Sequence, residues 1–183
     1  MIGNDIVDLQ LAKEQSDWTR KGFLDKQFSE VEQQIIVKAE NPFQQVWLFW
    51  SMKEAAYKCY TQLNQKRFFA PKKLRCKMRS SNEGIVTFEE HVFYTFSKIN
   101  AQFIHSLAKQ SLQQRSICSD FLIDNNVGES QYVKSQILAN FPKNTILKKD
   151  NFGVPSLYEK QKLPTAISLT HHGNYGGFAY LKY

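Results

Sequence analysis

The chain has 183 residues, of which 42% are hydrophobic and 14% aromatic, so residues 1–183 can bury the core of a single domain. No apolar run reaches the roughly 18 residues of a membrane helix, and the first residues do not read as a signal peptide, so we expect no membrane partner. The net charge of +7 is local, because residues 66–79 contain seven bases and no acid, while the remaining residues contain 17 of each. Three cysteines without a CxxC pair predict reduced thiols in a cytoplasmic protein.

Residues 1–9, MIGNDIVDL, predict a strand that contains two carboxylates among apolar residues. A strand this rich in Ile and Val is usually buried, and a buried carboxylate is unstable without a cation beside it. Asp5 and Asp8 therefore predict a positive charge, from a side chain or a metal ion, close to this strand.

A helix is predicted to follow Ser29, because Ser29 and Glu32 have the spacing of a capping box. Apolar residues follow at helical spacing, at Val31, Ile35 and Ala39. Asn41 and Pro42 then separate this helix from the next one.

The second helix is expected from about residue 44 to residue 63 and contains the segment VWLFWSMKEAAYK. Its composition predicts that most of it is buried. Glu54 and Lys58 lie four residues apart and hence on one face of the helix. They could form an ordinary ion pair, or Glu54 could join Asp5 in holding a hard divalent ion, with Lys58 beside a phosphate.

Residues 72–79 predict a half-buried strand with one cationic face. Apolar residues at 74, 76 and 78 alternate with Lys73, Arg75, Lys77 and Arg79. The strand is either a solvated edge or a surface for a polyanion, such as phosphate groups or an acidic protein.

The following segments predict mixed helices and strands without regular βαβ alternation, which indicates an α+β fold. In chain order we expect a strand at IVTFEEHVFYTF, a helix at 101–114, a strand at SICSDFLI, a helix at SQYVKSQILANF, a turn at NFGVP, and strands at TAISLTHH and GGFAYLKY around a His-Gly-Asn turn. In the first of these last two strands, Ser168, Thr170 and His171 stand among apolar residues and suit hydrogen bonds to a phosphate. His171 and His172 point to opposite faces, which argues against a zinc site.

Four motifs, GNDIVDL, WSMKEAAYK, GVP and ISLTH, occur in this order. Together they resemble the 4′-phosphopantetheinyl transferase superfamily, in its holo-acyl-carrier-protein synthase branch. The resemblance implies an antiparallel sheet packed against a long helix. It also implies an elaboration of that fold at about residues 64–150, inserted between the KEA motif and the GVP turn.

The resemblance also implies roles for individual residues. Asp5 and Glu54 would be ligands of Mg²⁺, Lys58 would contact a coenzyme A phosphate or assist proton transfer, and His171 would contact a coenzyme A phosphate. Asp8 would act indirectly, since a strand turns it to the other face.

The implied reaction moves 4′-phosphopantetheine from coenzyme A to a serine of an acidic acyl or peptidyl carrier protein, as in fatty acid or polyketide biosynthesis, and releases 3′,5′-ADP. The base would be Glu54 or a metal-bound water. Ser168 would help to bind coenzyme A, and Lys73 and Arg75 would meet either its 3′-phosphate or the carrier.

The sequence departs from the branch at three places. Asn4 replaces the usual aliphatic residue, and Leu11 replaces a basic residue that docks the carrier, for which Lys13 could substitute. The long insertion could complete within one chain the site that short synthases form between subunits, so both a monomer and a homo-oligomer such as a trimer are open.

The alternative function is a nucleic-acid-binding module, in which the basic strand 72–79 would bind phosphates and Phe68 and Phe69 would stack on bases. It leaves Asp5, Glu54 and Lys58 without a role, so nucleic acid is the less expected partner.

Overall fold

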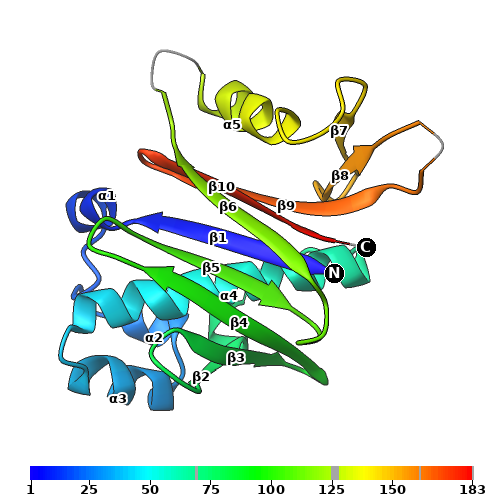
Figure 1. The fold of residues 1–183 in the computed structure, drawn as a ribbon. Coiled ribbons are helices and arrows are strands. Elements are labelled where there is room, and N and C mark those ends of the chain that lie inside the picture. Colours follow the sequence, from blue (N-terminus) through cyan, green and yellow to red (C-terminus); the bar gives the residue numbers. More distant parts are fainter. Residues whose placement is uncertain (69, 125–127, 161, 183) are drawn as a thin grey trace.

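The computed structural model describes residues 1–68, 70–124, 128–160 and 162–182. In these ranges the chain forms two antiparallel five-stranded sheets, with α-helices packed on them (Figure 1). Sheet A has the order β1-β5-β4-β3-β2 and sheet B the order β6-β10-β9-β8-β7. The predicted α+β class is therefore confirmed.

The strands of sheet A are β1 (Ile2–Asp8), β2 (Arg75–Met78), β3 (Glu83–Phe88), β4 (His91–Ile99) and β5 (Phe103–Lys109). Those of sheet B are β6 (Ser116–Leu122), β7 (Ile146–Lys149), β8 (Pro155–Tyr158), β9 (Thr165–His172) and β10 (Tyr175–Leu181). The helices are α1 (Leu9–Gln15), α2 (Phe23–Gln27), α3 (Glu30–Lys38), α4 (Pro42–Asn64), α5 (Glu129–Leu138) and the short 3₁₀ helix η1 (Pro71–Lys73). The sequence patterns did not predict α1, α2, η1, β7 or β8.

Helix α4 runs along one face of sheet A, as the long helix was predicted to do (Figure 1). The Asn41 side chain caps its first turn by accepting a hydrogen bond from the backbone N–H of Gln44. At Gly3 the helix and β1 approach so closely that a Cβ atom would lie 1.9 Å from the backbone oxygen of Ala55. A glycine at this position is what lets the helix backbone approach the strand.

The predicted capping box of α3 is present, and it also anchors α4. Glu32 accepts from the backbone N–H of Ser29 at 2.7 Å, and the same carboxylate oxygen accepts from Lys53 Nζ at 2.9 Å. Both charged side chains of this ion pair are 1% exposed. Of the apolar residues expected along α3, Val31 and Ile35 are exposed, by 67% and 40%.

Two predicted elements are wrong. Residues 101–114 were expected to be helical, but β5 occupies this region and pairs with β1 on one side and β4 on the other. Its apolar run suits a helix or a buried strand equally well, and two neighbouring strands decide the outcome. The segment IVTFEEHVFYTF is two strands, β3 and β4, joined at Glu89 and Glu90, with Glu89 at φ 52°. The described part of the region expected to be an elaboration, about 64–150, thus contains four of the five strands of sheet A and one α-helix, α5, where two helices were expected.

The alternation predicted for the basic strand is confirmed in β2. Cys76 is buried, whereas Arg75 and Lys77 are exposed. The strand lies at the opposite edge of sheet A from β1, four strand spacings or about 19 Å away.

Strand β10 of sheet B packs on the face of sheet A that lies away from α4, where Ile2, Leu107, Ala179 and Leu181 form a buried cluster, while β9 lies along the free edge of β1. Helix α5 covers the other face of sheet B (Figure 1). The predicted turns are confirmed at Gly173, with φ 56°, and Gly153, with φ 74°. Among the described residues, no helix is long and apolar enough to cross a membrane.

Candidate active site

Asp5 lies in the middle of β1 and turns its side chain towards α4. The carboxylate oxygen Oδ1 accepts hydrogen bonds from Lys58 Nζ at 3.0 Å and from the Thr170 hydroxyl at 3.2 Å. The Ser51 hydroxyl donates to the backbone oxygen of Asp5 at 3.0 Å. Lys58 is therefore a cation of the kind that the first strand was predicted to need.

Glu54 and Lys58 face this carboxylate from consecutive turns of α4. Lys58 Nζ also donates to the backbone oxygen of Asn4 at 2.9 Å, so one ammonium group holds two neighbouring residues of β1. The pKa of Glu54 is raised to about 7, mainly by burial and also by the negative charge of Asp5, while Lys58 acts in the opposite direction. The structure thus brings together Asp5, Glu54 and Lys58, the three predicted residues from the first strand and the long helix.

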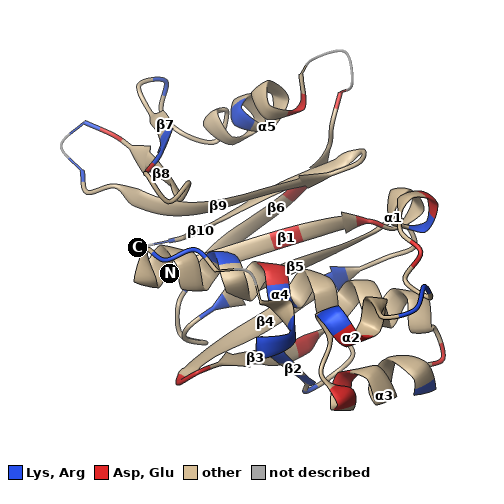
Figure 2. Ribbon diagram, turned by 180° about the vertical axis from the view of Figure 1, so that it is seen from behind, with Lys and Arg blue, Asp and Glu red and all other residues tan. Residues whose placement is uncertain are grey.

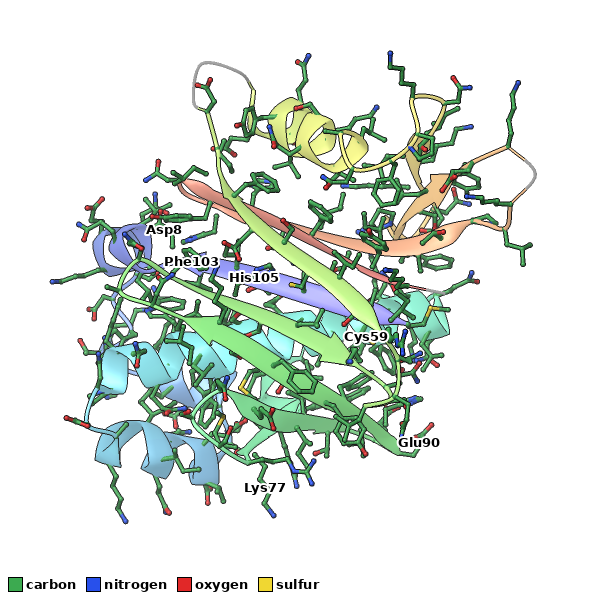
Figure 3. The ribbon with its side chains drawn as sticks, viewed as in Figure 1. Asp8, Cys59, Lys77, Glu90, Phe103 and His105 are labelled. Carbon is green, nitrogen blue, oxygen red and sulfur yellow. The ribbon has the colours of Figure 1, made fainter. Side chains whose placement is uncertain are left out.

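Asp8 lies on the other face of β1, as predicted. One of its carboxylate oxygens caps α1 by accepting from the backbone N–H groups of Gln10 and Leu11, and the other accepts from the N–H of Asn174 at 3.0 Å. Asp8 therefore ties α1 to the β9–β10 turn, which explains its burial without a metal ion (Figure 3).

Strand β9 meets β1 through side chains. Ser168 Oγ, Thr170 Oγ1 and His172 Nδ1 accept hydrogen bonds from three alternate backbone N–H groups of β1, those of Asn4, Ile6 and Asp8. His171 points away from β1, and its ring nitrogen Nδ1 lies 3.5 Å from the carboxylate of Glu129 on α5. The opposite orientation of the two histidines is confirmed, and His171 is not brought to Asp5.

A cavity of about 350 Å³ opens beside Lys58 and Ser168. Its lining includes three cations, Lys58, Arg67 and Lys149, and the turn at Gly153. The Arg67 guanidinium donates to the backbone oxygen of Phe152 and occupies the space that a side chain at position 153 would need. The GVP motif therefore has a glycine both for its positive φ and for this contact with Arg67.

The sequence patterns did not predict that Arg67 and Lys149 line this cavity. Arg67 belongs to the basic window 66–79, whose charge was noticed, but nothing local indicates that it reaches a turn 85 residues away in sequence. Lys73 and Arg75, which were expected to bind substrate, lie instead on η1 and β2 at the far edge of sheet A (Figure 2).

The family model of the 4′-phosphopantetheinyl transferase superfamily matches residues 1–116, more than half of the chain. The chain belongs to this superfamily. Its function is therefore that of a transferase of this class, and the motif resemblance is confirmed. The match ends before β9 and before the turn at Gly153, so Thr170, Lys149 and Gly153 lie outside it.

The solved structures that are similar to the chain include two holo-[acyl-carrier-protein] synthases. The holo-[acyl-carrier-protein] synthase of Helicobacter pylori, in complex with coenzyme A, has 17% identity and a TM-score of 0.49, with 61% of this chain and 100% of that chain covered. The holo-[acyl-carrier-protein] synthase of Thermotoga maritima has 12% identity and a TM-score of 0.46, with 89% of this chain and 83% of that chain covered. No curated protein matches the chain.

Proposed function

We propose that the protein transfers 4′-phosphopantetheine from coenzyme A to a serine hydroxyl of an acidic carrier protein and releases 3′,5′-ADP. The observation that carries this proposal is the meeting of Asp5 and Glu54 around Lys58, at the edge of a cationic cavity. Membership of the superfamily supports the reaction class.

Asp5 and Glu54 fit a Mg²⁺ ion. Both offer hard carboxylate oxygens, and the charge of Asp5 contributes to the raised pKa of Glu54, a repulsion that a bound dication would relieve. Within the described ranges, no group of three or more His, Cys, Asp and Glu side chains could hold a metal ion. This agrees with Mg²⁺, which takes one or two carboxylates and completes its shell with water and substrate phosphates. When bound there, Mg²⁺ would supply positive charge next to the pyrophosphate of coenzyme A.

The cavity beside Lys58 is our candidate for the phosphates of coenzyme A. Lys58, Arg67 and Lys149 provide positive charge there, and Ser168 lies at the same place. The Helicobacter pylori synthase that resembles this chain is described in complex with coenzyme A. We therefore assign the 3′-phosphate to Arg67 and Lys149 rather than to Lys73 and Arg75, while a contact from His171 stays a prediction.

In the transfer step, Glu54 is our candidate to accept the proton of the carrier serine, because its carboxylate lies beside Asp5 and Lys58 at the proposed site of transfer. The serine oxygen forms a bond to the phosphorus that carries the pantetheine arm. The bond from that phosphorus to the bridging oxygen breaks, and 3′,5′-ADP leaves. Lys58 would hold Asp5 in place and stabilise the negative charge on the leaving phosphate.

The carrier would approach from the α1 end of β1. A larger cavity, of about 760 Å³, lies there between α1 and the start of α4, and Lys13 is part of its lining. Lys13 is accordingly our candidate for the basic docking residue that Leu11 cannot provide. Because β1, α4 and β9 belong to one chain, we propose that the site needs no second subunit.

One of the two aromatic residues that were expected to stack on nucleic-acid bases is packed against other aromatic side chains of the protein. Phe68 stacks on Phe88 with ring centroids 4.4 Å apart and packs edge-on against Tyr57 and Tyr60, so it is not available to bases. Phe69 lies outside the described residues.

The cytoplasmic location stays a prediction.

The test is incubation with coenzyme A, Mg²⁺ and an apo acyl carrier protein, followed by intact mass measurement of the carrier. The wild-type protein should add one phosphopantetheine group. Glu54→Gln should lower the rate by roughly 10²–10⁴-fold, the range for loss of a general base, and Asp5→Asn should lower it similarly through loss of the metal.

Matched controls remove the same charges elsewhere. Asp25→Asn and Glu40→Gln change exposed carboxylates and should keep the wild-type rate. Full activity of a folded Glu54→Gln variant would refute the assignment.

A further inference from the structure

The contact between β1 and β9 consists of side chains from one strand and backbone from the other. Strand β9 pairs through its own backbone with β8 and β10, and meets β1 with Ser168, Thr170 and His172. The three hydrogen bonds measure 2.8, 3.1 and 3.0 Å and recur at every second residue of both strands. This spacing follows from the two-residue period of a strand.

Thr170 differs from Ser168 and His172, because its hydroxyl also donates a hydrogen bond to Asp5 Oδ1. A hydroxyl has one proton to donate and two lone pairs to accept with, and Thr170 accepts from the Ile6 N–H while it donates to the carboxylate. It is 5% exposed, so water does not readily replace either bond. Thr170 is thus a bridge from the backbone of β1 to a carboxylate on the same strand.

The two donors to Asp5 use the same oxygen. Lys58 and Thr170 both bond to Oδ1, which leaves Oδ2 without a donor among the described residues. Two fixed donors on one oxygen set the orientation of the carboxylate and keep the other oxygen available. The branched Cβ of threonine restricts its own rotation, so the hydroxyl is held in advance.

We infer that Thr170 is a positioning residue that orients Asp5 so that Oδ2 is offered to the Mg²⁺ ion. The inference rests on the proposed function, in which Asp5 and Glu54 hold that ion. Groups that orient metal ligands in this way typically contribute about 10–100-fold to metal affinity.

The chain offers a matched control for this inference. His172 accepts from β1 as Thr170 does, but its partner is the backbone N–H of Asp8, and it makes no hydrogen bond to Asp5 among the described residues. Thr170→Val keeps the shape of the side chain and removes the hydroxyl, whereas His172→Ala removes one bond between the strands. Thr170→Ser restores the hydroxyl and should recover most of the function.

The experiment measures Mn²⁺ binding, as a probe for Mg²⁺, by electron paramagnetic resonance on protein with coenzyme A and without carrier. Thr170→Val should weaken binding by about tenfold or more. Thr170→Ser and His172→Ala should stay within about threefold of wild type, since both keep a hydroxyl at position 170. In turnover assays, Thr170→Val should raise the Mg²⁺ concentration for half-maximal rate, with kcat largely restored at saturating Mg²⁺.

Circular dichroism and thermal unfolding identify variants that fail to fold, and Thr170→Ala replaces Thr170→Val in that case. Equal weakening by Thr170→Val and His172→Ala would overturn the inference, because the effect would then belong to the contact between the strands. Wild-type Mn²⁺ binding by Thr170→Val would overturn it as well.

Asp5→Asn separates this inference from the proposed function. If Asp5→Asn loses Mn²⁺ and Thr170→Val keeps it, the role of Thr170 alone is wrong. If Asp5→Asn binds Mn²⁺ as the wild type does, Asp5 is not a metal ligand, and the role inferred for Thr170 is refuted as well.

Discussion

Asn4 connects the candidate site with the interface between the two sheets. Its backbone oxygen holds Lys58 Nζ, and its side-chain amide lies 2.9 Å from His105 Nε2 on the opposite face of β1. His105 is 3% exposed and fits against Gly177, where a Cβ atom would lie 2.7 Å from its ring (Figure 3). The departure from an aliphatic residue at position 4 therefore goes together with a buried histidine, which needs a hydrogen-bond partner.

His105 should make the stability of the protein depend on pH. Burial lowers its pKa from the usual 6.5, and the nearby carboxylates of Asp120 and Asp5 oppose this only in part. Below pH 6.5, His105 binds a proton in the unfolded chain but stays neutral in the folded protein until the pH reaches its lower folded-state pKa. The histidine's contribution to stability is therefore fully present above pH 6.5 and is lost as the pH falls towards the folded-state pKa.

Urea unfolding at pH 7.5, 6.5 and 5.5 checks this prediction. The free energy of unfolding should fall by at most about 1.4 kcal/mol per pH unit from this one group. His105→Gln keeps a hydrogen-bond acceptor for Asn4 and should show a shallower dependence below pH 6.5. Parallel curves for the two proteins would contradict the assignment.

At the scale of elements, the site depends on the distance between α4 and β1. Glu54 and Lys58 come from the helix and Asp5 from the strand, and Gly3 sets their separation two residues before Asp5. The buried pair of Lys53 and Glu32 holds the opposite side of the same helix turn to α3. The helix is thus anchored on both sides next to Glu54.

Gly3→Ala should damage both stability and activity. Its Cβ would meet backbone atoms of α4 at 1.9 and 2.6 Å, which no side-chain rotation can relieve. We expect a loss of about 1–3 kcal/mol in the free energy of unfolding, as for overpacked cores. The folded fraction should also transfer phosphopantetheine more slowly, because Asp5 moves relative to Glu54.

Gly128→Ala is the control for this substitution. A Cβ atom at Gly128 has no atom within 4 Å and the residue has a φ of −55°, so stability and rate should stay close to wild type. If Gly3→Ala unfolds at the same urea concentration as Gly128→Ala, the close approach of α4 to β1 does not require a glycine at position 3.

At the scale of the whole molecule, most of the excess positive charge lies away from the candidate site. Arg67 lines the cavity, but the bases of residues 72–79 cluster around η1 and the edge strand β2, about 19 Å across sheet A from β1. Arg75 and Lys77 cannot touch a phosphate at Asp5 from there. Their field can still attract an acidic carrier before it docks, because electrostatic steering acts over such distances at low salt.

Neutralising β2 should therefore slow encounter with the carrier and leave the chemistry unchanged. The double variant Arg75→Gln, Lys77→Gln should lower kcat/KM for the carrier by roughly tenfold at low ionic strength. The difference should vanish near 1 M salt, where the screening length is about 3 Å, and kcat and the KM for coenzyme A should not change.

Lys143→Gln with Lys160→Gln removes two exposed charges from the other side of the molecule and should have a smaller effect at every salt concentration. A loss that persists in high salt would indicate a direct contact of β2 with the carrier or the substrate.

The sequence by itself determined the parts of the molecule that depend on local spacing. The opposite orientations of Asp5 and Asp8 follow from the period of a strand, and the common face of Glu54 and Lys58 follows from the period of a helix. The capping box at Ser29 is equally local. These patterns and the order of the four motifs were sufficient to predict the superfamily and to identify three residues of the candidate site.

Only the tertiary structure decided which distant segments meet. The strand β5 forms because β1 and β4 bind both of its edges, and Thr170 reaches Asp5 across 165 residues of chain. Arg67 joins the cavity and Arg75 does not, although both belong to one basic window. The charge and the hydrophobic periodicity of a segment limit the kinds of element with which it can pair. The packing of the two sheets then selects the neighbour that it has in the structure.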